Sequence, residues 1–377
     1  MNLRKSLIER DPVAILAPVV AVALALVVGA GILLALGKDP MEAYGSMLKG
    51  AFGDANRLNN TITRAIPLLL VAIGICISFR GGVINIGAEG QLFIGAVAVT
   101  AFSVTVGGSL PAILAVPLAL LVGFSAGAAW GAIPGYLKAY FDVNEILSTV
   151  MMNQIATQML LLLLSGPLID PREIQLGTRI PQSAQLPESV WLGRLAPPSR
   201  LHTGVFIALL AAVVVYLLLW RTPLGYRVRA VGQNKDAARY AGISVPLYMV
   251  LSLTLSGGLA GLAGTVEVMG VTRRMVEGFA VGYGFSGIVV ALFGRLHPLG
   301  AIPSAFFFGA LLTGAEQMQR TIQVPSATMI ALQGLVVIFV VSSDVWVRRR
   351  AVRRAARLGS ESPAVELSME TVAAEAK

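Results

Sequence analysis

The residues in this chain that could bind or conduct a polar molecule are polar side chains that lie within or between apolar runs. Asn85–Gln91 places two amides and the carboxylate of Glu89 between two apolar runs. A carboxylate at membrane depth costs about 2.5–3.5 kcal/mol on insertion scales, so Glu89 should face a cavity or a protein partner. Each of the four glycines at positions 81, 82, 87 and 90 disfavours a helix by about 1 kcal/mol relative to Ala. These residues indicate either a broken helix lining a polar path or a cytoplasmic turn with Glu89 in water.

A second polar group lies in the apolar run that begins near residue 145. Asn153 and Gln154 are expected to hydrogen-bond a neighbouring helix, and contact with a polar substrate is the alternative. Just before them, Asp142 and Glu145 have the spacing of a capping box, with Asp in place of the usual Ser or Thr. We therefore predict that a helix begins here, capped by Asp142.

Covalent and metal chemistry are not indicated by the sequence. His202 and His297 are isolated, and the single cysteine, Cys76, lies within an apolar run. No group of His, Cys and carboxylates has metal-ligand spacing, and the phosphate-binding pattern G-x-x-x-x-G-K-[ST] does not occur. We therefore expect no catalytic residue, no metal and no cofactor on this chain.

The composition is that of a polytopic membrane protein. Of 377 residues, 56% are hydrophobic and 13% are charged, whereas soluble domains contain about 25% charged residues. Several apolar runs are long enough to cross about 30 Å of hydrocarbon. The net charge of +9 is concentrated between and after these runs, as the positive-inside rule expects. We predict an all-α integral protein of the lipid bilayer, with no nucleic-acid partner.

The apolar runs predict about ten transmembrane helices, or eight with re-entrant pieces. Residues 1–12 should form a cytoplasmic N-terminus, 13–343 the membrane domain, and 344–377 a basic and then disordered cytoplasmic tail. The run at 285–294 is too short to cross alone, which predicts a broken segment. Residues 41–52 should lie on the outer surface, and 169–203 should form an external loop. The expected spans are 13–36, 65–79, 92–106, 112–136, 145–168, 204–220, 247–267, 285–294, 298–316 and 326–343.

The polar stretch 221–246 interrupts the apolar runs and carries five basic residues. Asn234 suits a helix N-cap, residues 235–241 favour a helix, and Gly242 suits the left-handed position after it. Such a helix, about 10 Å long, is marginal alone in water and should pack against something. Either the stretch is a handle for a soluble motor protein, or it is a basic loop that only fixes the topology.

Four stretches together resemble one protein family: 81–91 (GGVINIGAEGQ), 144–153 (NEILSTVMMN), 231–243 (VGQNKDAARYAGI) and 284–300 (GFSGIVVALFGRLHPLG). In order and spacing they are similar to the permease subunits of bacterial ABC importers for branched-chain amino acids, simple sugars and nucleosides. The chain looks most like the longer permease of nucleoside-type importers. Where this chain reads Asn-Ile-Gly-x-Glu-Gly-Gln, the ribose-like branch more often reads Asp-Leu-Ser-x-Gly, which favours a nucleoside over a sugar such as ribose.

The resemblance implies a multi-pass protein of the bacterial cytoplasmic (inner) membrane. Ten crossings would put both termini in the cytoplasm, and the missing phosphate-binding pattern predicts no ATPase activity on this chain. The implied partners are an ATP-binding subunit with two fused nucleotide-binding halves, which would hold ATP and Mg, a second permease subunit, and an extracytoplasmic substrate-binding lipoprotein. An ion-driven secondary transporter is the alternative, but it would need ionisable residues inside several spans. Only Glu89 and Glu267 are candidates for that role.

The resemblance also bears on two groups of candidate residues, although individual substrate contacts do not follow from it. The region 232–242 matches the coupling helix that contacts the ATPase; its small residues would permit close docking, and its basic residues could reach an acidic rim. The segment 81–91 would lie at the translocation path. The coupling candidates are Gly232, Asn234, Ala237, Ala238, Arg239, Ala241 and Gly242, and the path candidates are Asn85, Glu89, Gln91 and Asn153.

Overall fold

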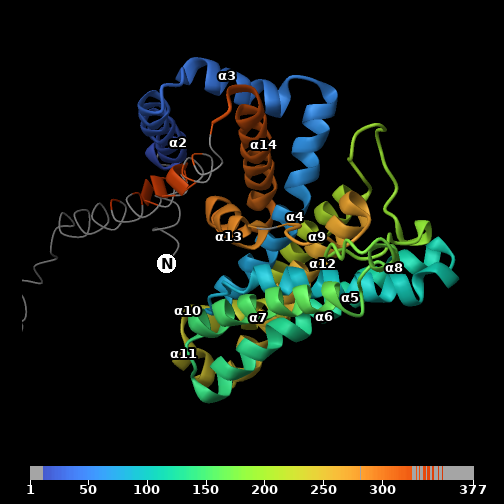
Figure 1. Cartoon of the computed structure of the whole chain (residues 1–377). Coiled ribbons are helices and arrows are strands. Elements are labelled where there is room, and N and C mark those ends of the chain that lie inside the picture. Colours follow the sequence, from blue (N-terminus) through green and yellow to red (C-terminus); the bar gives the residue numbers. More distant parts are fainter. Residues whose placement is uncertain are drawn as a thin grey trace, which may run out of the picture. The chain divides into compact units, whose positions relative to one another are not determined.

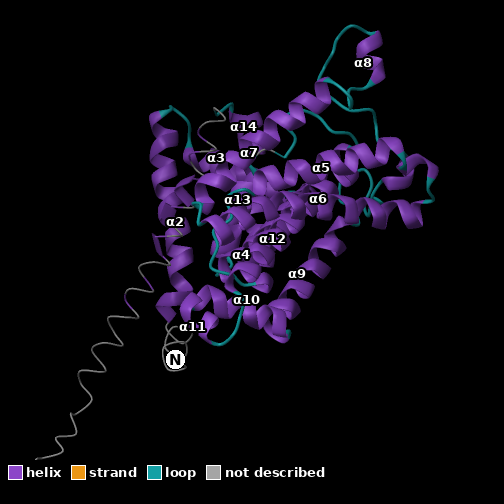
Figure 2. Cartoon of the chain, turned by 90° about the horizontal axis from the view of Figure 1, so that it is seen from below, coloured by secondary structure: helices purple, strands orange, loops and turns teal. Residues whose placement is uncertain are grey.

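The computed structural model describes residues 12–280 and 282–324, together with scattered positions between 328 and 350. Within these residues the regular elements are helices, with only isolated β-bridges and no strand (Figure 2). The prediction of an all-α protein is confirmed. The chain divides into two compact units, residues 41–323 and residues 1–40 with 324–377.

The smaller unit contributes α2 (Pro12–Ala35), which matches the predicted first span. The larger unit contains the helices that carry the candidate site, and α4 and α14 run beside each other within it (Figure 1). Its helices are α3 (Pro40–Phe52), α4 (Ala55–Arg80), α5 (Ala88–Thr105), α6 (Ala112–Phe141), α7 (Glu145–Ser165), α8 (Pro171–Gln175), α9 (Gly204–Arg221), α10 (Pro223–Gln233), α11 (Lys235–Tyr240), α12 (Val245–Glu267), α13 (Tyr283–Phe293) and α14 (Pro298–Ile322).

Among the described residues, seven helices are long and apolar enough to cross a membrane: α4, α5, α6, α7, α9, α12 with its π-helical continuation to Thr272, and α14. The chain is therefore a multi-pass membrane protein. Helix α13 has 11 residues and spans only about 16 Å, as expected for a run too short to cross alone. The predicted span at 326–343 is described only in part, and the predicted terminal segments lie almost wholly outside the described residues.

Helix α4 begins earlier than the apolar pattern predicted. The expected span began at 65, whereas the helix starts at Ala55 because Asp54 accepts a hydrogen bond from the backbone N–H of Arg57 at 2.8 Å. The first turns of α4 are polar, so they carry no hydropathy signal. With 26 residues, α4 is about 39 Å long and exceeds the hydrocarbon thickness.

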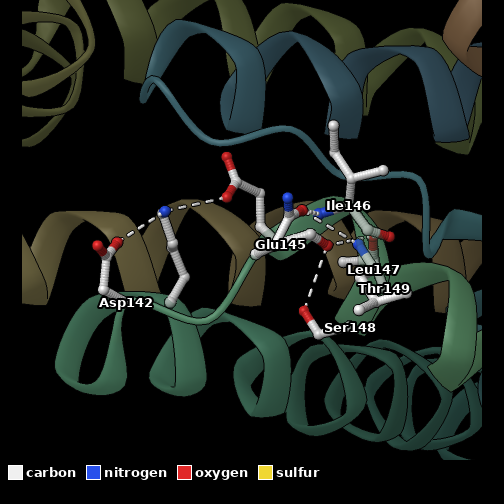
Figure 3. Close-up of polar contacts among 8 residues, drawn as sticks. Asp142, Glu145, Ile146, Leu147, Ser148 and Thr149 are labelled. Carbon is white, nitrogen blue, oxygen red and sulfur yellow. Dashed lines mark hydrogen bonds and ion pairs between the residues drawn. The ribbon is translucent and has the colours of Figure 1, made fainter.

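The prediction that Asp142 caps α7 is wrong, as the turn between α6 and α7 shows (Figure 3). Helix α7 begins at Glu145 as expected, but its N-cap is Asn144, whose side chain accepts from the backbone N–H groups of Ile146 and Leu147 at 2.9 and 3.3 Å. Asp142 instead ends α6 in the left-handed conformation and pairs with Lys138 at 2.8 Å. The Lys138 ammonium bridges this carboxylate and that of Glu145, at 2.8 and 3.2 Å, so Asp142 takes part in an ion pair and does not cap α7.

Helix α12 is the centre of the larger unit and packs against α4, α5 and α6. Glycines make this close packing possible. A Cβ on Gly95 of α5 would lie 2.4 Å from the Cα of Gly261, and one on Gly127 of α6 would lie 2.4 Å from the carbonyl oxygen of Gly257. Contacts this short allow backbones to touch, as small residues do in membrane helix pairs.

Loop 169–203 folds back onto the segment that follows α12. The backbone N–H of Ser183 donates to the carbonyl of Met275 at 2.8 Å, and that of Leu186 donates to Arg273 at 2.9 Å. The guanidinium of Arg273 lies over the ring of Trp191, 3.9 Å from its centroid. This loop is therefore tied to the loop that leads into α13.

His202, at the end of loop 169–203, is expected to make stability depend on pH. Its ring is 1% exposed, and burial lowers the pKa of His202 to about 4 from its ordinary 6.5. The unfolded chain therefore binds a proton between these values while the folded chain does not, so stability should fall as the pH drops from 6.5 towards 4. The full loss is about 3 kcal/mol for a shift of this size.

Thermal unfolding of the purified full chain at pH 7.5, 6.0 and 5.0 would measure this effect. The Tm of the unsubstituted protein should fall more steeply with pH than that of His202→Gln, which has no titratable ring. Because the carboxylates are common to both proteins, the difference between the two curves isolates His202. Parallel curves would contradict the expectation.

Candidate functional site

The segment between α4 and α5, residues 81–87, is not helical and lies inside the larger unit. Gly82 has a φ of +73°, and both Val83 and Asn85 are fully buried. Glu89, in the first turn of α5, is 5% exposed. This burial contradicts the alternative of a water-exposed turn and agrees with a broken helix.

Glu89 caps a helix that lies almost two hundred positions away in the sequence. Its Oε1 accepts from the backbone N–H of Gly282 at 2.5 Å, and its Oε2 accepts from that of Gly284 at 2.6 Å. Helix α13 begins between them, and no side chain of its own segment caps it. The negative carboxylate thus satisfies N–H groups that a helix start leaves unpaired, and it also suits the positive end of the helix dipole.

Asn153 of α7 holds the broken segment from the other side. Its Nδ2 donates to the carbonyl of Ile86 at 2.9 Å, and its Oδ1 accepts from the backbone N–H of Gly90 at 2.8 Å. A Cβ on Gly90 would lie 2.9 Å from the Cα of Asn153, so only glycine permits this approach. The amide of Asn153 therefore fixes the backbone across the start of α5, as the helix-bonding interpretation expected.

Asn85 and Gln91 form a buried network behind this segment. The Nδ2 of Asn85 donates to the Gln91 Oε1 and to the Ser256 Oγ, each at 2.9 Å, and its Oδ1 accepts from the backbone N–H of Gly87 at 2.9 Å. Asn85 is 0% exposed and Gln91 is 1% exposed. Their amides hold the backbone in place, which differs from the expectation that all four path candidates border a substrate path.

A cavity of about 350 Å³ opens beside Glu89. Its size lies within the range of small-molecule sites. Polar and aromatic side chains share its wall, so it can hydrogen-bond a polar ligand while covering an aromatic or apolar part of it. The residues that give it this character are Glu89, Asn153, Gln154, Thr157 and Glu277, with Phe93, Phe279 and Phe285.

Two of the four path candidates, Glu89 and Asn153, line this cavity. Sequence reasoning missed Glu277, Phe279 and Phe285. Phe285 lies in the stretch 284–300 that carried the resemblance, but nothing singled it out there. No motif marked Glu277 or Phe279, because they reach the cavity through the way the loop before α13 folds against α5, where Phe93 and Phe279 lie with ring centroids 5.7 Å apart.

The stretch 221–246 forms two short helices, α10 and α11. The predicted caps of α11 are confirmed: the Oδ1 of Asn234 accepts from the backbone N–H groups of Asp236 and Ala237 at 3.0 Å each, and Gly242 has a φ of +76°. Helix α10 was not predicted. Its cap is Thr222, whose hydroxyl accepts from the Gly225 N–H at 3.2 Å, and Pro223 opens it.

The predicted coupling residues in and just after α11 differ in their exposure to solvent. Ala238 is only 4% exposed and faces its own chain, so it differs from the expected role in docking, while Ala237, Arg239 and Ala241 are exposed. Tyr240 is 96% exposed, and sequence reasoning missed it. A bulky aromatic residue in a short polar helix was the signal available for it.

Gly232, at the end of α10, lies in backbone contact with the broken segment. A Cβ on Gly232 would be 2.0 Å from the carbonyl oxygen of Arg80, and one on Gly82 would be 2.9 Å from the Cα of Gly232. Arg80 is held in turn, since its Nε donates to the carbonyl of Leu296 at 3.0 Å and its guanidinium lies over Trp220. The end of α10, directly before α11 in the chain, therefore contacts the segment that leads from Gly82 to Glu89.

Residues 57–341 match the family described as the permease component of the branched-chain amino acid transport system. The chain belongs to this permease family. All four stretches that carried the resemblance lie inside the matched region. The prediction of a permease of this group is confirmed.

Curated relatives are similar over most of their length. The chain is 38% identical to the guanosine ABC transporter permease protein NupP of Bacillus subtilis, over 87% of this chain and 93% of that protein. It is 36% identical to the glucose ABC transporter permease protein TsgB13 of Haloferax volcanii, over 92% of each. It is 32% identical to the nucleoside ABC transporter permease protein NupB of Lactococcus lactis, over 81% of this chain and 84% of that protein. No solved structure is significantly similar to this permease.

Proposed function

We propose that this permease is the membrane-spanning subunit of an ABC importer for nucleosides. The observation that carries the proposal is the backbone contact of Gly232, at the end of the helix before the exposed α11, with Gly82 in the segment that leads to the cavity at Glu89. A subunit that hydrolyses no ATP itself needs such a link between a docking surface and a substrate path. Relatives named for guanosine and for nucleosides, at 38% and 32% identity, support the substrate class.

The proposal assigns ATP and Mg to a separate ATP-binding subunit with two fused nucleotide-binding halves. A second permease subunit and an extracytoplasmic lipoprotein complete the importer in the cytoplasmic (inner) membrane of a bacterium, with both termini of this chain cytoplasmic. A relative named guanosine ABC transporter permease protein NupQ, 32% identical over 66% of this chain, comes from the same organism as NupP. Two related permeases in one organism support pairing with a paralogue.

In this mechanism, α11 and the exposed residues around it dock on the ATP-binding subunit. A change of nucleotide state moves α11, and the glycine contact at Gly232 carries that movement to the broken segment. The segment holds Glu89, and Glu89 holds the start of α13, so the wall of the cavity moves as well. Each state of the ATPase then selects one state of the path, which is a two-state coupling.

A sugar is the second candidate substrate class. The relative named for glucose is 36% identical and covers 92% of this chain, which is more of the chain than the guanosine relative covers. The cavity at Glu89 suits either class, because polar and aromatic residues share its wall.

ATP-driven uptake by the reconstituted importer separates the two classes. Labelled guanosine, adenosine, ribose and glucose are offered to vesicles that contain this permease with its ATP-binding subunit, its paralogue and its binding protein. Uptake of the nucleosides, with ribose and glucose excluded, is expected. Uptake of glucose alone would move the assignment to the sugar class, and uptake by this chain alone on an ion gradient would contradict the ATP-driven mechanism.

Tyr240→Ala is expected to weaken docking of the ATP-binding subunit at least tenfold. A fully exposed tyrosine on a protein surface is suited to anchor a partner, and truncation of such an anchor typically costs 2 kcal/mol or more. Affinity measured with the detergent-solubilised permease and the purified ATP-binding subunit gives the number. Tyr240→Phe keeps the ring and should stay within threefold of the original affinity. Unchanged affinity in Tyr240→Ala would place the docking surface elsewhere.

A further inference from the structure

A second cavity, of about 430 Å³, lies between α4, α12, α13 and α14, and none of its lining residues borders the cavity at Glu89. Its wall is rich in charged groups from four separate parts of the fold. The side chains that matter here are Arg64, Arg200, Glu267, Tyr283, Glu316 and Arg320.

Some of these charges neutralise one another and some do not. Glu316 pairs with Arg64 at 2.5 Å and with Arg320 at 3.1 Å. Glu267 is only 8% exposed, yet within the described part of the chain its carboxylate has no ion pair and accepts no hydrogen bond. Arg200 likewise forms no ion pair there, although Arg64 and Arg200 both act on Glu267 electrostatically.

A buried carboxylate without a hydrogen-bonding partner is costly, and proteins place such groups where something else can pair with them. Here the acceptor Glu267 and the donor Arg200 face one open space. The three arginines would repel a cationic ligand, and the two glutamates would repel an anionic one. The wall therefore suits a neutral ligand that presents hydrogen-bond donors to Glu267 and acceptors to the arginines.

We propose that this cavity binds the transported nucleoside before it reaches Glu89, an inference that rests on the proposed function. Adjacent donors and acceptors occur both on the sugar hydroxyls and on the edge of the base, and either can satisfy Glu267 and Arg200 together. The volume is in the range of small-molecule sites. The chemistry recognised is that of a neutral, hydroxyl- or amide-bearing ligand.

The position of the cavity fits the entry side of an importer. Arg64 lies 16 positions before Arg80 on α4, so the cavity is about 24 Å from the end of α4 that touches Gly232. Helix α3, which contacts α14 next to Glu316 and Arg320 through Gly314, lies at the top of the larger unit in Figure 1, and α10 and α11 lie at its bottom. The cavity is therefore remote from the proposed docking surface.

The start of α13 forms the wall between the two cavities. Tyr283 lines the charged cavity, while Phe279 and Phe285 line the cavity at Glu89. Gly282 and Gly284, on either side of Tyr283, are the residues held by the Glu89 carboxylate. A ligand in the charged cavity thus reaches the second cavity only when this segment moves, which places the two sites in sequence.

Binding of labelled guanosine to the solubilised permease complex, without its binding protein, tests the site. Glu267→Gln removes the charge of the acceptor, and Arg200→Gln removes that of a donor in a loop. Each is expected to weaken guanosine binding tenfold or more. Arg172→Gln, an exposed arginine of the same loop that does not line the cavity, is the matched control and should bind like the unsubstituted complex. Ribose, 2′-deoxyguanosine and inosine then show whether the sugar or the base is recognised.

Wild-type affinity in both Glu267→Gln and Arg200→Gln would overturn the site, and so would equal losses in Arg172→Gln. Arg200→Gln keeps the test valid if the buried substitution at Glu267 prevents folding. Failure of the proposed function has a different signature, because the unsubstituted importer would then take up no nucleoside at all. If it takes up glucose instead, the same variants tested with glucose decide the site.

Discussion

Replacement of Glu89 by Gln should reduce ATP-driven uptake at least a hundredfold while the protein still inserts into the membrane. The two carboxylate oxygens of Glu89 accept from the backbone N–H groups of Gly282 and Gly284. A glutamine has one oxygen, and its NH₂ group would face a second N–H donor. One buried N–H is then left unpaired at the start of α13, where the cavity wall must hold its position.

The size of the effect follows from what each substitution leaves behind. An unsatisfied buried donor costs about 1–3 kcal/mol, and bonds to charged acceptors are stronger than neutral ones. Glu89→Gln loses one such bond and Glu89→Ala loses both. The Glu89→Ala variant should therefore also have a lower Tm than the unsubstituted protein. Because α13 separates the two cavities, the loss falls on the segment that has to move during transport, and uptake should suffer more than stability.

Glu277→Gln is the matched control for Glu89→Gln. Glu277 lines the same cavity but is exposed, and it caps no helix. Because Gln keeps a hydrogen-bonding amide at the cavity wall and no helix loses its cap, uptake should fall by less than tenfold when only this charge is removed. Equal losses at both positions would mean that cavity charge, rather than the cap on α13, is what transport requires.

Local signals in the sequence predicted a large part of the site. The glycine cluster at 81–90 marked the break between α4 and α5, the length of the run at 285–294 marked the short helix α13, and Asn234 with Gly242 marked both ends of α11. Each of these depends on residues that are neighbours in the chain. Propensity, hydropathy and caps are local quantities, so the sequence displays them directly.

The pairings that build the site are not local, and the sequence did not contain a signal for them. Glu89 and Gly284 are 195 positions apart, and Asn153 and Gly90 are 63 apart. Glycine is a common packing residue in membrane helices, so a glycine alone does not reveal which backbone will approach it. The choice of Asn144 rather than Asp142 as the cap of α7 could not be read from the sequence, because both residue types favour caps and only the structure shows that Asp142 ends α6 in the left-handed conformation. The inward face of Ala238 also could not be read from α11, because six residues are too few to show a helical period.

Gly232→Ala should uncouple the permease from its ATP-binding subunit without releasing it. The new Cβ would lie 2.0 Å from the carbonyl oxygen of Arg80 and 2.8 Å from the backbone nitrogen of Gly82, both shorter than real contacts allow. Because both neighbours are backbone atoms, α10 has to move away from the broken segment. The docking surface on α11 is untouched, so affinity for the ATP-binding subunit should change less than threefold while uptake falls at least tenfold.

Gly242→Ala provides the comparison for this substitution. Gly242 also needs glycine, because its φ is +76°, but a Cβ there would meet nothing within 4 Å. The cost is the left-handed conformation alone, about 1–2 kcal/mol, and it falls on the end of α11 rather than on the contact with Gly82. Gly242→Ala should therefore lower ATP-binding-subunit affinity together with uptake, whereas Gly232→Ala should lower uptake alone. If Gly232→Ala imports at the original rate, movement of α11 reaches the cavity by another route.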